Sequence, residues 1–405
     1  MNSVIKYLKF SICFLLNSLF KCIPHRTHKK YDVVIVRADL LGDLIIWTDC
    51  LRAYREKYKG KKVLYICTSQ TKRIAEELNY FTDVIGFDPI NAITKISYHV
   101  KLIKQMRNIE ADIVISPMKR RQFASDFICN VIKANKKVAI TSNRFITVKN
   151  FIDYLMSKLL NIGVGNITDL YYDSIIKIPN IDRINEFEAN EMITRRIVDD
   201  NYRYRLSDLD PLIVRSSMSV SKHYCFISLS SSTVLKDWPI EKLAELVKYI
   251  PVKYKLLLSG YGEKDLKRAE YLIKYDNGQH LYLNYVNKTT ITDMIKLISE
   301  ADFLIGNDSS GVHIAAACRV PSLCFLHGAL FDFFVPYPDS VPEKEYHPHC
   351  VYKRLPCYDC KYNCTNNFDK NSPFYCLREV TVDMARIELE KIIKFLNNKK
   401  NVKNI

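Results

Sequence analysis

The sequence predicts an α/β protein built from two doubly wound domains in tandem, and three observations lead to this fold class. The chain has 405 residues, which exceeds the size at which a single hydrophobic core usually stops growing. Short apolar strands alternate with helix-forming segments along residues 31–141 and again along residues 223–328. A polar stretch without periodicity, residues 201–222, separates the two series. Because apolar strands separated by helices form parallel sheets covered on both faces, each series predicts a domain.

The first series predicts an N-terminal domain over residues 31–200. Its expected strands are residues 31–38, 62–68, 83–88, 111–117 and 136–141, and its expected helices are residues 44–58, 71–80 and 93–108. A charged helical stretch at residues 181–200 ends this half, and a linker over residues 201–222 follows it.

The second series predicts a C-terminal domain over residues 223–380. Its expected strands are residues 223–230, 254–260, 280–285, 302–307 and 322–328, and its expected helices are residues 240–250, 263–275, 291–301 and 311–319. A cysteine-rich stretch ends this domain, and residues 381–405 form a last helix and tail. Ligands of doubly wound sheets bind beyond the carboxyl ends of the strands, so we expect the chemistry in the loops that follow them.

The composition is that of an ordinary globular protein, with 48% hydrophobic and 26% charged residues. The formal net charge of +16 favours anionic partners: phosphorylated substrates, acidic lipid surfaces or nucleic acid. Nucleic acid is the least expected of these, because the basic residues are dispersed and no known binding module is present. An odd number of cysteines, 13, without a secretory signal indicates a reducing compartment.

The N-terminal segment, residues 1–30, is basic and partly apolar. Its apolar stretch from Leu8 to Phe20 is interrupted by Lys9 and Asn17 and is too short to span a bilayer. No small-residue cleavage site precedes the basic residues 21–30, which argues against a signal peptide. We interpret the segment as an amphipathic helix on an anionic membrane surface. A helix packed on the body of the protein is the alternative.

The strongest candidate site is GNDSSGVHIAAA, residues 306–317. A strand leads there through small polar residues directly into a helix, so the amides of Ser309–His313 would be first-turn donors. Such amides, together with the helix dipole, bind pyrophosphate. In the alternative interpretation, Asp308 or Ser309 is only a helix cap and His313 only packs in the helix.

Two further candidate loops each follow the first expected strand of one domain. The loop SLSSSTVLKDW carries hydroxyls at Ser231 and Ser232 and a cation at Lys236, which could meet phosphate as a point charge. A flexible serine turn with a solvated lysine is the alternative. In VIVRADLLGDLIIW, Gly42 and Asp43 are expected in the loop before a helix. Asp43 could cap this helix or could be a general base that deprotonates an attacking hydroxyl.

Two other patterns are weaker. Lys119, Arg120 and Arg121 follow the strand 111–117 and could hold an anionic acceptor, with a solvated charge run as the alternative. Four cysteines have spacings that a zinc site could use, although reduced thiols without metal are the favoured interpretation; they are Cys357, Cys360, Cys364 and Cys376. Neither a Walker loop nor a GxGxxG motif is present, which argues against a nucleoside triphosphatase or a simple dinucleotide enzyme.

From about residue 31 to its end, the chain resembles the lipopolysaccharide heptosyltransferases of glycosyltransferase family 9. Four stretches carry the resemblance: VIVRADLLGDLIIWTDCLRAY, SLSSSTVLKDWPIEKLAELV, the segment from VNKTT to SLCFLHG, and the ending CYDCKYNC with CLREVTVDMARIELEKI. The helix NEFEANEMITRRI also resembles one that precedes the second domain in this family. The resemblance implies a GT-B fold, in which two Rossmann-like domains face each other across a cleft.

The resemblance also implies roles for individual residues. Asp43 is the expected base of an inverting, metal-independent transfer that uses no cofactor, and Lys236 is an expected ligand of the donor phosphates. The expected cradle for the donor sugar and its diphosphate consists of Asp308, Ser309, Ser310, Gly311, Val312 and His313. Two departures from the family pattern leave the donor open: Ser310 and Gly311 stand where many members have Gly-Pro, and Asn287 stands where they have Gly.

The expected partners are a nucleotide sugar, typically ADP-heptose in this family, and an anionic lipid-linked glycan such as the lipid A core. This places the protein in the cytoplasm, on the cytoplasmic face of the bacterial inner membrane. Two other functions stay open: a sugar-nucleotide epimerase of the same fold, and a non-catalytic glycan- or nucleotide-binding protein.

Overall fold

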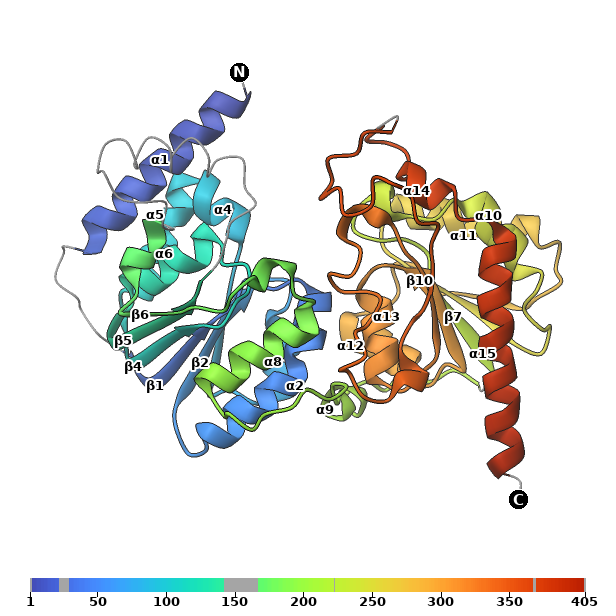
Figure 1. The fold of residues 1–405 in the computed structure, drawn as a ribbon, viewed down its shortest axis with the longest axis horizontal. Coiled ribbons are helices and arrows are strands. Elements are labelled where there is room, and N and C mark those ends of the chain that lie inside the picture. The colour runs from blue at the N-terminus through green and yellow to red at the C-terminus, as the bar shows by residue number, and fades with distance from the viewer. Residues whose placement is uncertain (1, 22–28, 142–166, 222, 367–368, 404–405) are drawn as a thin grey trace. The chain divides into compact units, whose positions relative to one another are not determined.

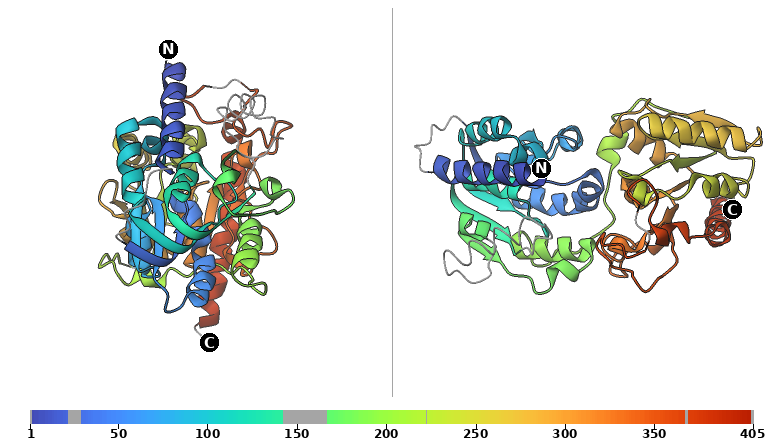
Figure 2. Two further views of the ribbon diagram at one scale, coloured as in Figure 1. Left: turned by 90° about the vertical axis from the view of Figure 1, so that its left-hand side faces the viewer. Right: turned by 90° about the horizontal axis from the view of Figure 1, so that it is seen from above.

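The computed structural model describes residues 2–21, 29–141, 167–221, 223–366 and 369–403 (Figure 1). The chain forms two compact units. The first comprises Met1–Leu44 with Cys50–Arg203, and the second comprises Ile45–Asp49 with Tyr204–Ile405. Each is a layered α/β unit, as the further views show (Figure 2).

The first unit is built on a six-stranded parallel sheet with the order β3-β2-β1-β4-β5-β6. The strands are β1 Lys29–Val36, β2 Val63–Thr68, β3 Asp83–Phe87, β4 Ile109–Ser116, β5 Lys133–Ile140 and β6 Ser174–Ile176. The helices are α1 Asn2–Lys21, α2 Leu41–Lys57, α3 Lys72–Leu78, α4 Pro89–Thr94, α5 Ile96–Met106, α6 Phe123–Val131 and α8 Glu186–Ile197. Helices α1, α4, α5 and α6 pack together on one face, and α2 and α8 lie on the other (Figure 1). The order reverses between β1 and β4, which makes this pair the topological switch point.

The second unit repeats the plan with a six-stranded parallel sheet in the order β12-β11-β10-β7-β8-β9. The strands are β7 Tyr224–Ser228, β8 Lys255–Ser259, β9 Tyr282–Asn284, β10 Phe303–Asn307, β11 Ser322–Phe325 and β12 His349–Val351. The helices are α9 Asp210–Ile213, α10 Ile240–Val247, α11 Glu263–Tyr275, α12 Ile291–Ser299, α13 Ser310–Ala317, α14 Tyr375–Arg378 and α15 Val382–Lys403. The switch point lies between β7 and β10. Together, the two sheets confirm the predicted doubly wound α/β fold.

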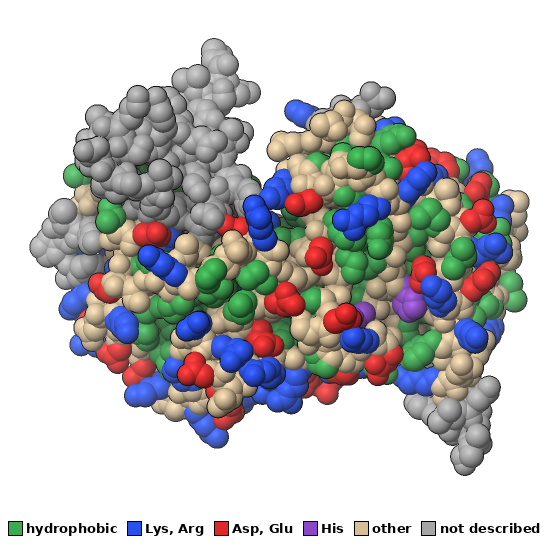
Figure 3. Space-filling view, in the orientation of Figure 1, with side chains coloured by type: hydrophobic (Ala, Val, Ile, Leu, Met, Phe, Trp, Pro, Cys, Tyr) green, Lys and Arg blue, Asp and Glu red, His purple; other side chains and the backbone are tan. Residues whose placement is uncertain are grey.

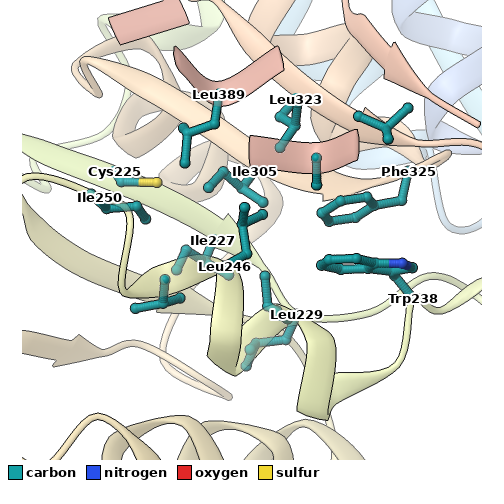
Figure 4. Packing of buried hydrophobic residues seen from close by; sticks show 14 of the residues in the cluster. Cys225, Ile227, Leu229, Trp238, Leu246, Ile250, Ile305, Leu323, Phe325 and Leu389 are labelled. Carbon is teal, nitrogen blue, oxygen red and sulfur yellow. The ribbon is translucent and has the colours of Figure 1, made fainter. Parts of the chain in front are cut away.

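The core of the second unit includes an aromatic stack that joins distant segments. The rings of Trp238 and Phe325 lie 3.9 Å apart between centroids, at an interplanar angle of 18° (Figure 4). The Trp238 indole N–H donates to the Val380 carbonyl at 3.2 Å, and the Trp238 backbone N–H donates to the Asn307 side chain at 2.8 Å. The loop after β7 is thereby attached to the end of β10 and to the start of α15.

The segment after α8 runs along α2. The Tyr204 hydroxyl donates to the Ile46 carbonyl, and the Ser207 hydroxyl donates to the Ile45 carbonyl, both at 2.6 Å. Arg319, which follows α13, donates to the Ser207 carbonyl at 2.8 Å. These bonds explain why Ile45–Asp49 group with the second unit.

Several elements differ from the sequence-based expectation. The helix expected at residues 93–108 is divided into α4 and α5, because Lys95 adopts an extended conformation between them. Helix α4 also begins earlier than expected, where Asp88 caps it by accepting a hydrogen bond from Asn91 N–H at 2.9 Å. Helix α6 was not predicted because all its residues are buried, which removes the apolar-polar period that marks a helix. The short strands β6 and β12 were also missed.

Helix α1 packs on the body of the first unit through one face. Phe10 is buried against the rings of Phe123 and Phe127, and the Asn17 amide donates to the Phe127 carbonyl at 3.0 Å. On this face, α1 therefore matches the alternative interpretation of the N-terminal segment, a helix packed on the body of the protein. A second face stays open: exposed fractions of about three fifths are found at Leu8, Leu15 and Leu19.

The surface carries both signs of charge. In the view of Figure 3, basic side chains are interspersed with acidic ones over the described part of both units. Among the described residues, no helix has the length and apolar character needed to cross a membrane. The basic residues 22–28 lie outside the described part.

Candidate functional site

The phosphate-binding segment predicted from the sequence lies at the switch point of the second sheet. Strand β10 ends at Asn307, and Ser309 is the N-cap of α13 in extended conformation. Where the structure describes this turn, the Ser309 hydroxyl makes no capping bond to it. The interpretation of Ser309 as a cap alone is therefore not supported. The first-turn amides of Ser310–His313 begin a helix at the sheet edge where doubly wound folds bind phosphates.

Lys236 reaches the same place from the neighbouring strand. It ends the short 3₁₀ turn Val234–Lys236, and its Nζ lies 3.7 Å from Oδ2 of Asp308. Both side chains are largely buried. The structure therefore brings together two residues, 72 positions apart, that the sequence singled out separately.

The charges of this site act on each other. Burial by itself raises the pKa of Asp308, but the charge of Lys236 and the nearby His327 ring outweigh it and hold that pKa well below its usual range. Burial lowers the pKa of His313 to about 4 against the opposing charge of Asp308. His313 is therefore neutral at neutral pH. Its Nδ1 lies 2.8 Å from the Tyr337 hydroxyl, so His313 connects α13 to the segment that carries Tyr337.

The serine loop after β7 is held by Asp237, a residue that the sequence analysis missed. The buried Asp237 carboxylate accepts hydrogen bonds from the Ser231 amide at 2.6 Å and the Ser231 hydroxyl at 3.0 Å. Lys264 pairs with its other oxygen at 2.9 Å. Of the two predicted serines, Ser231 is fixed in this way, whereas Ser232 is exposed. No local motif marks Asp237, because its partner Ser231 lies six residues away, beyond the two-residue span of an Asx turn.

In the first unit, Asp43 lies at the switch point of the first sheet. Helix α2 begins at Leu41, so Gly42 and Asp43 lie in its first turn and not, as expected, in the loop before it. The Asp43 carboxylate accepts a hydrogen bond from the Leu40 amide at 3.3 Å, which is a capping interaction from within the helix. Its position leaves it half-buried.

A charged cluster surrounds Asp43. Burial raises the pKa of Asp43 to about 7, and the carboxylates of Asp39 and Glu186 act in the same direction, against Arg37. Arg37 itself is buried and pairs with Asp39 through two contacts of 2.6 and 3.1 Å. A general base is most effective when its pKa is near the working pH, so this environment suits Asp43 to proton abstraction.

The basic triplet after β4 is neither a solvated charge run nor an open anion site. Lys119 is buried and lies 3.8 Å from Glu186, and it also donates to a backbone carbonyl. Arg121 is buried and pairs with Asp169 and, at 3.9 Å, with Asp126. Buried charges require such partners. Of the expected acceptor ligands, only Arg120 is half-buried and remains a candidate.

The cysteine-rich ending contacts the turn that follows β11. The Cys376 sulfur accepts a hydrogen bond from the Gly328 backbone amide at 3.3 Å, and the Cys357 sulfur accepts one from the Asn366 side-chain amide at 3.2 Å. In the parts of the chain that are described, no three His, Cys, Asp or Glu side chains are arranged to hold a metal ion. The four thiols whose spacing could suit zinc are therefore not arranged as a metal site in the described chain.

A comparison with protein families decides the assignment. The family model described as "Glycosyltransferase family 9 (heptosyltransferase)" matches residues 99–341, more than half of the chain. The chain belongs to glycosyltransferase family 9. It is therefore a glycosyltransferase by family, and the resemblance expected from its motifs is confirmed.

Relatives of this family 9 chain are distant in sequence. It is 18% identical over 321 residues to lipooligosaccharide heptosyltransferase 2 of Campylobacter jejuni, covering 79% of this chain and 86% of the relative. It is 21% identical over 316 residues to lipopolysaccharide heptosyltransferase 3 of Escherichia coli, covering 74% and 83%.

Solved structures confirm the GT-B fold of the family 9 chain. The E. coli heptosyltransferase WaaC with ADP superimposes with a TM-score of 0.64 at 12% identity, covering 90% of this chain and 100% of the other. A family 9 glycosyltransferase from Veillonella parvula gives a TM-score of 0.63 at 14% identity, covering 91% and 98%.

One departure from the family 9 pattern has a local explanation. Asn287, where the family resemblance expects glycine, has a φ of 62°. Asparagine tolerates this left-handed conformation better than most residues do. Its side-chain oxygen also accepts a hydrogen bond from the Gly262 amide at 2.7 Å, which joins the loops after β9 and β8.

We predict that Arg121, the last member of the basic triplet, contributes to stability through its buried ion pairs. Arg121→Met leaves Asp126 and Asp169 without their cation and should lower the free energy of unfolding by about 3–5 kcal/mol. Arg120→Met is the matched control and should cost about 1 kcal/mol or less. Urea denaturation followed by circular dichroism measures both. If Arg121→Met were as stable as the wild type, its buried pairing would not have the structural role assigned here.

Proposed function

We propose that this family 9 glycosyltransferase is an inverting heptosyltransferase that transfers heptose from ADP-heptose to the core of a lipopolysaccharide or lipooligosaccharide. The observation that carries the proposal is the meeting of Lys236 with Asp308 at the first turn of α13. The curated relatives are named as heptosyltransferases for these two glycans, and solved relatives hold ADP or ADP-2-deoxy-2-fluoro heptose. The donor and acceptor are inferred for this chain from those proteins.

In the proposed reaction, Asp43 accepts the proton of the acceptor hydroxyl. The oxygen of that hydroxyl attacks the anomeric carbon from the side opposite the diphosphate, and the bond between this carbon and the diphosphate oxygen breaks. The electron pair of that bond leaves with ADP. Lys236, the amides at the start of α13 and the dipole of this helix stabilise the departing charge, so we propose that the transfer requires no metal ion.

The reaction itself tests the proposal. ADP-heptose and a truncated lipooligosaccharide acceptor should yield ADP and an acceptor heavier by one heptose, detected by mass spectrometry. ADP-heptose alone should be unchanged, whereas an epimerase would convert it without an acceptor. No product with any heptose-deficient acceptor would count against the heptosyltransferase proposal.

Asp43→Asn should lower kcat by roughly a hundredfold or more, because the amide cannot accept the proton. In the wild type, the carboxylate form is the active one and its pKa is about 7, so kcat should rise as the pH increases from 5.5 to 8. The affinity for ADP, measured by calorimetry, should be unchanged by the substitution. Full activity of Asp43→Asn would eliminate Asp43 as the base.

Lys236→Met should weaken ADP binding by about tenfold or more, because a charge-assisted contact to the diphosphate is lost. Lys267→Met is the matched control: it removes the same charge from an exposed side chain that pairs with Glu263. We expect the control to bind ADP within about threefold of the wild type. Equal losses in the two variants would show that general charge, and not the position of Lys236, governs affinity.

We also propose that the protein acts on the cytoplasmic face of the inner membrane, where its lipid-linked acceptor would be found. Three observations support this: α1 holds lysines and no acidic residue, its outer face exposes Leu8, Leu15 and Leu19, and Lys9 beside them is exposed. Apolar side chains next to cations favour the interface of an anionic bilayer.

Replacing Leu8, Leu15 and Leu19 with Ser should reduce binding to phosphatidylglycerol vesicles by about tenfold or more, because the apolar contact with the bilayer is lost. Sedimentation with vesicles measures the bound fraction. The control replaces three exposed apolar residues of the second unit, Val252, Leu281 and Ile387, with Ser. Binding that is unchanged in the α1 variant would refute the proposed membrane contact.

A further inference from the structure

Two cysteines of the second sheet lie directly opposite each other on neighbouring strands. Cys324 of β11 is the register partner of Cys350 of β12, and the two strands run parallel. Neighbouring strands lie about 4.8 Å apart, which falls within the Cα separation of about 4.4–6.8 Å that a disulfide spans. Among the described strands, no other register pair consists of two cysteines. The pairing therefore places two thiols where a disulfide can join the strands.

The two thiols point to the same face of the sheet. Side chains alternate along a strand, so the neighbours of a residue point the opposite way. Leu323 and Phe325 of β11 point into the core of the second unit (Figure 4), and Val351 of β12 belongs to the same core. Cys324 and Cys350 therefore both face away from this core, on the other side of the sheet.

The two thiols differ in their access to solvent. Cys350 is partly exposed, and its Sγ–H donates to the Pro348 carbonyl at 3.4 Å. Cys324 is fully buried, and the neighbouring Cys350 thiol together with burial raises the pKa of Cys324 well above its usual value. An oxidant reaches the accessible thiol first. Cys350 is therefore the thiol that an oxidant attacks, and Cys324 is the one that then bonds to it.

Strand β12 can follow the movement that such a bond needs. The Cβ atoms joined by a disulfide lie about 3.5–4.5 Å apart, closer than neighbouring strands, so β11 and β12 must approach each other here. β12 is three residues long and forms the edge of its sheet next to β11. A short edge strand has few ladder bonds to disturb, and a bond formed with displacement is readily reduced again. The disulfide should therefore be reversible.

The same part of β11 holds the proposed donor loop. The Asp308 amide donates to the Phe325 carbonyl at 3.1 Å, and the amide of the residue after Phe325 donates to the Val351 carbonyl at 3.0 Å. Phe325 directly follows Cys324, and Val351 directly follows Cys350. A displacement of β12 against β11 therefore reaches the backbone of Asp308 through two successive hydrogen bonds.

We propose that Cys324 and Cys350 are a reversible oxidation site, at which hydrogen peroxide converts the two thiols into a disulfide between β11 and β12 and so weakens binding at the proposed donor site. The oxidation site itself stands on the strand register. Its effect on the donor rests on the proposed function.

The oxidation takes place in two steps. The Cys350 thiolate attacks one peroxide oxygen, so that an S–O bond forms, the O–O bond breaks and Cys350 becomes a sulfenic acid. The Cys324 sulfur then attacks the Cys350 sulfur: the S–S bond forms, the S–O bond breaks, and the departing hydroxide takes the Cys324 proton and leaves as water. The two thiols are oxidised to one disulfide, and one peroxide is reduced to two water molecules. A thiol such as dithiothreitol reverses the change by exchange.

The bond can be detected in the full-length protein without any substrate. Native protein is treated with hydrogen peroxide, the remaining thiols are blocked with N-ethylmaleimide in denaturant, and an unreduced digest is analysed by mass spectrometry. We expect a linked pair of peptides containing Cys324 and Cys350, which dithiothreitol separates. Cys350→Ser should abolish this pair, and Cys360→Ser, the matched control, should keep it. Oxidation of other thiols, or of Cys350 alone, without this link would overturn the proposal.

Calorimetry with ADP tests the effect on the donor site. Oxidation of the wild type should weaken ADP binding about fivefold, the scale of one net hydrogen bond, and dithiothreitol should restore it. Peroxide should leave the affinity of Cys350→Ser unchanged, whereas Cys360→Ser should respond as the wild type does. An oxidised wild type that binds ADP as before, or an equal loss in Cys350→Ser, would overturn the link between the thiol pair and the donor site.

The failure of this proposal is distinguishable from the failure of the proposed function. If reduced wild-type protein does not bind ADP, the proposed donor fails, and the linked peptides alone decide the oxidation site. If ADP binds and heptose is transferred but no linked peptides form, the oxidation site fails and the heptosyltransferase stands.

Discussion

The hydrogen bond from the Trp238 backbone to the Asn307 side chain joins the two loops that form the proposed donor site. One loop supplies Lys236, two residues before Trp238, and the other supplies Asp308, one residue after Asn307. The stack of Trp238 on Phe325 fixes the first loop to the sheet, and the stack and hydrogen bond together set the distance between cation and carboxylate. In the proposed donor site, cation and carboxylate are thus held by contacts within the protein, and such preorganisation reduces the cost of binding.

The two aspartates proposed for chemistry are held in opposite electrostatic environments. Desolvation raises the pKa of Asp43 toward neutrality, and the neighbouring carboxylates of Asp39 and Glu186 raise it further. Asp308 is also buried, but a lysine and a histidine keep it ionised. Residues of one chemical type can serve as a proton acceptor or as a permanent anion when their surroundings differ in this way.

The fold was predictable because it depends on local patterns. Apolar strands and amphipathic helices are visible in any window of the sequence, and glycosyltransferase motifs located Asp43, Lys236 and Asp308. What the sequence could not show depends on partners distant along the chain. The buried pairing of Arg121 with Asp169 is one example, and helix α6, whose complete burial leaves no periodicity, is another.

The burial of the cysteines decides which thiols of the native protein can be modified. Burial raises the pKa of Cys13 to about 11 and those of Cys67, Cys129 and Cys318 to about 12, so almost no reactive thiolate forms there at neutral pH. Within the described chain, Cys350, Cys357, Cys360 and Cys364 are only partly buried. A maleimide dye would therefore attach to thiols of β12 and of the cysteine-rich ending before it attaches to the fully buried ones. The wild-type chain thus offers a natural attachment point for a fluorescent reporter of nucleotide-sugar binding.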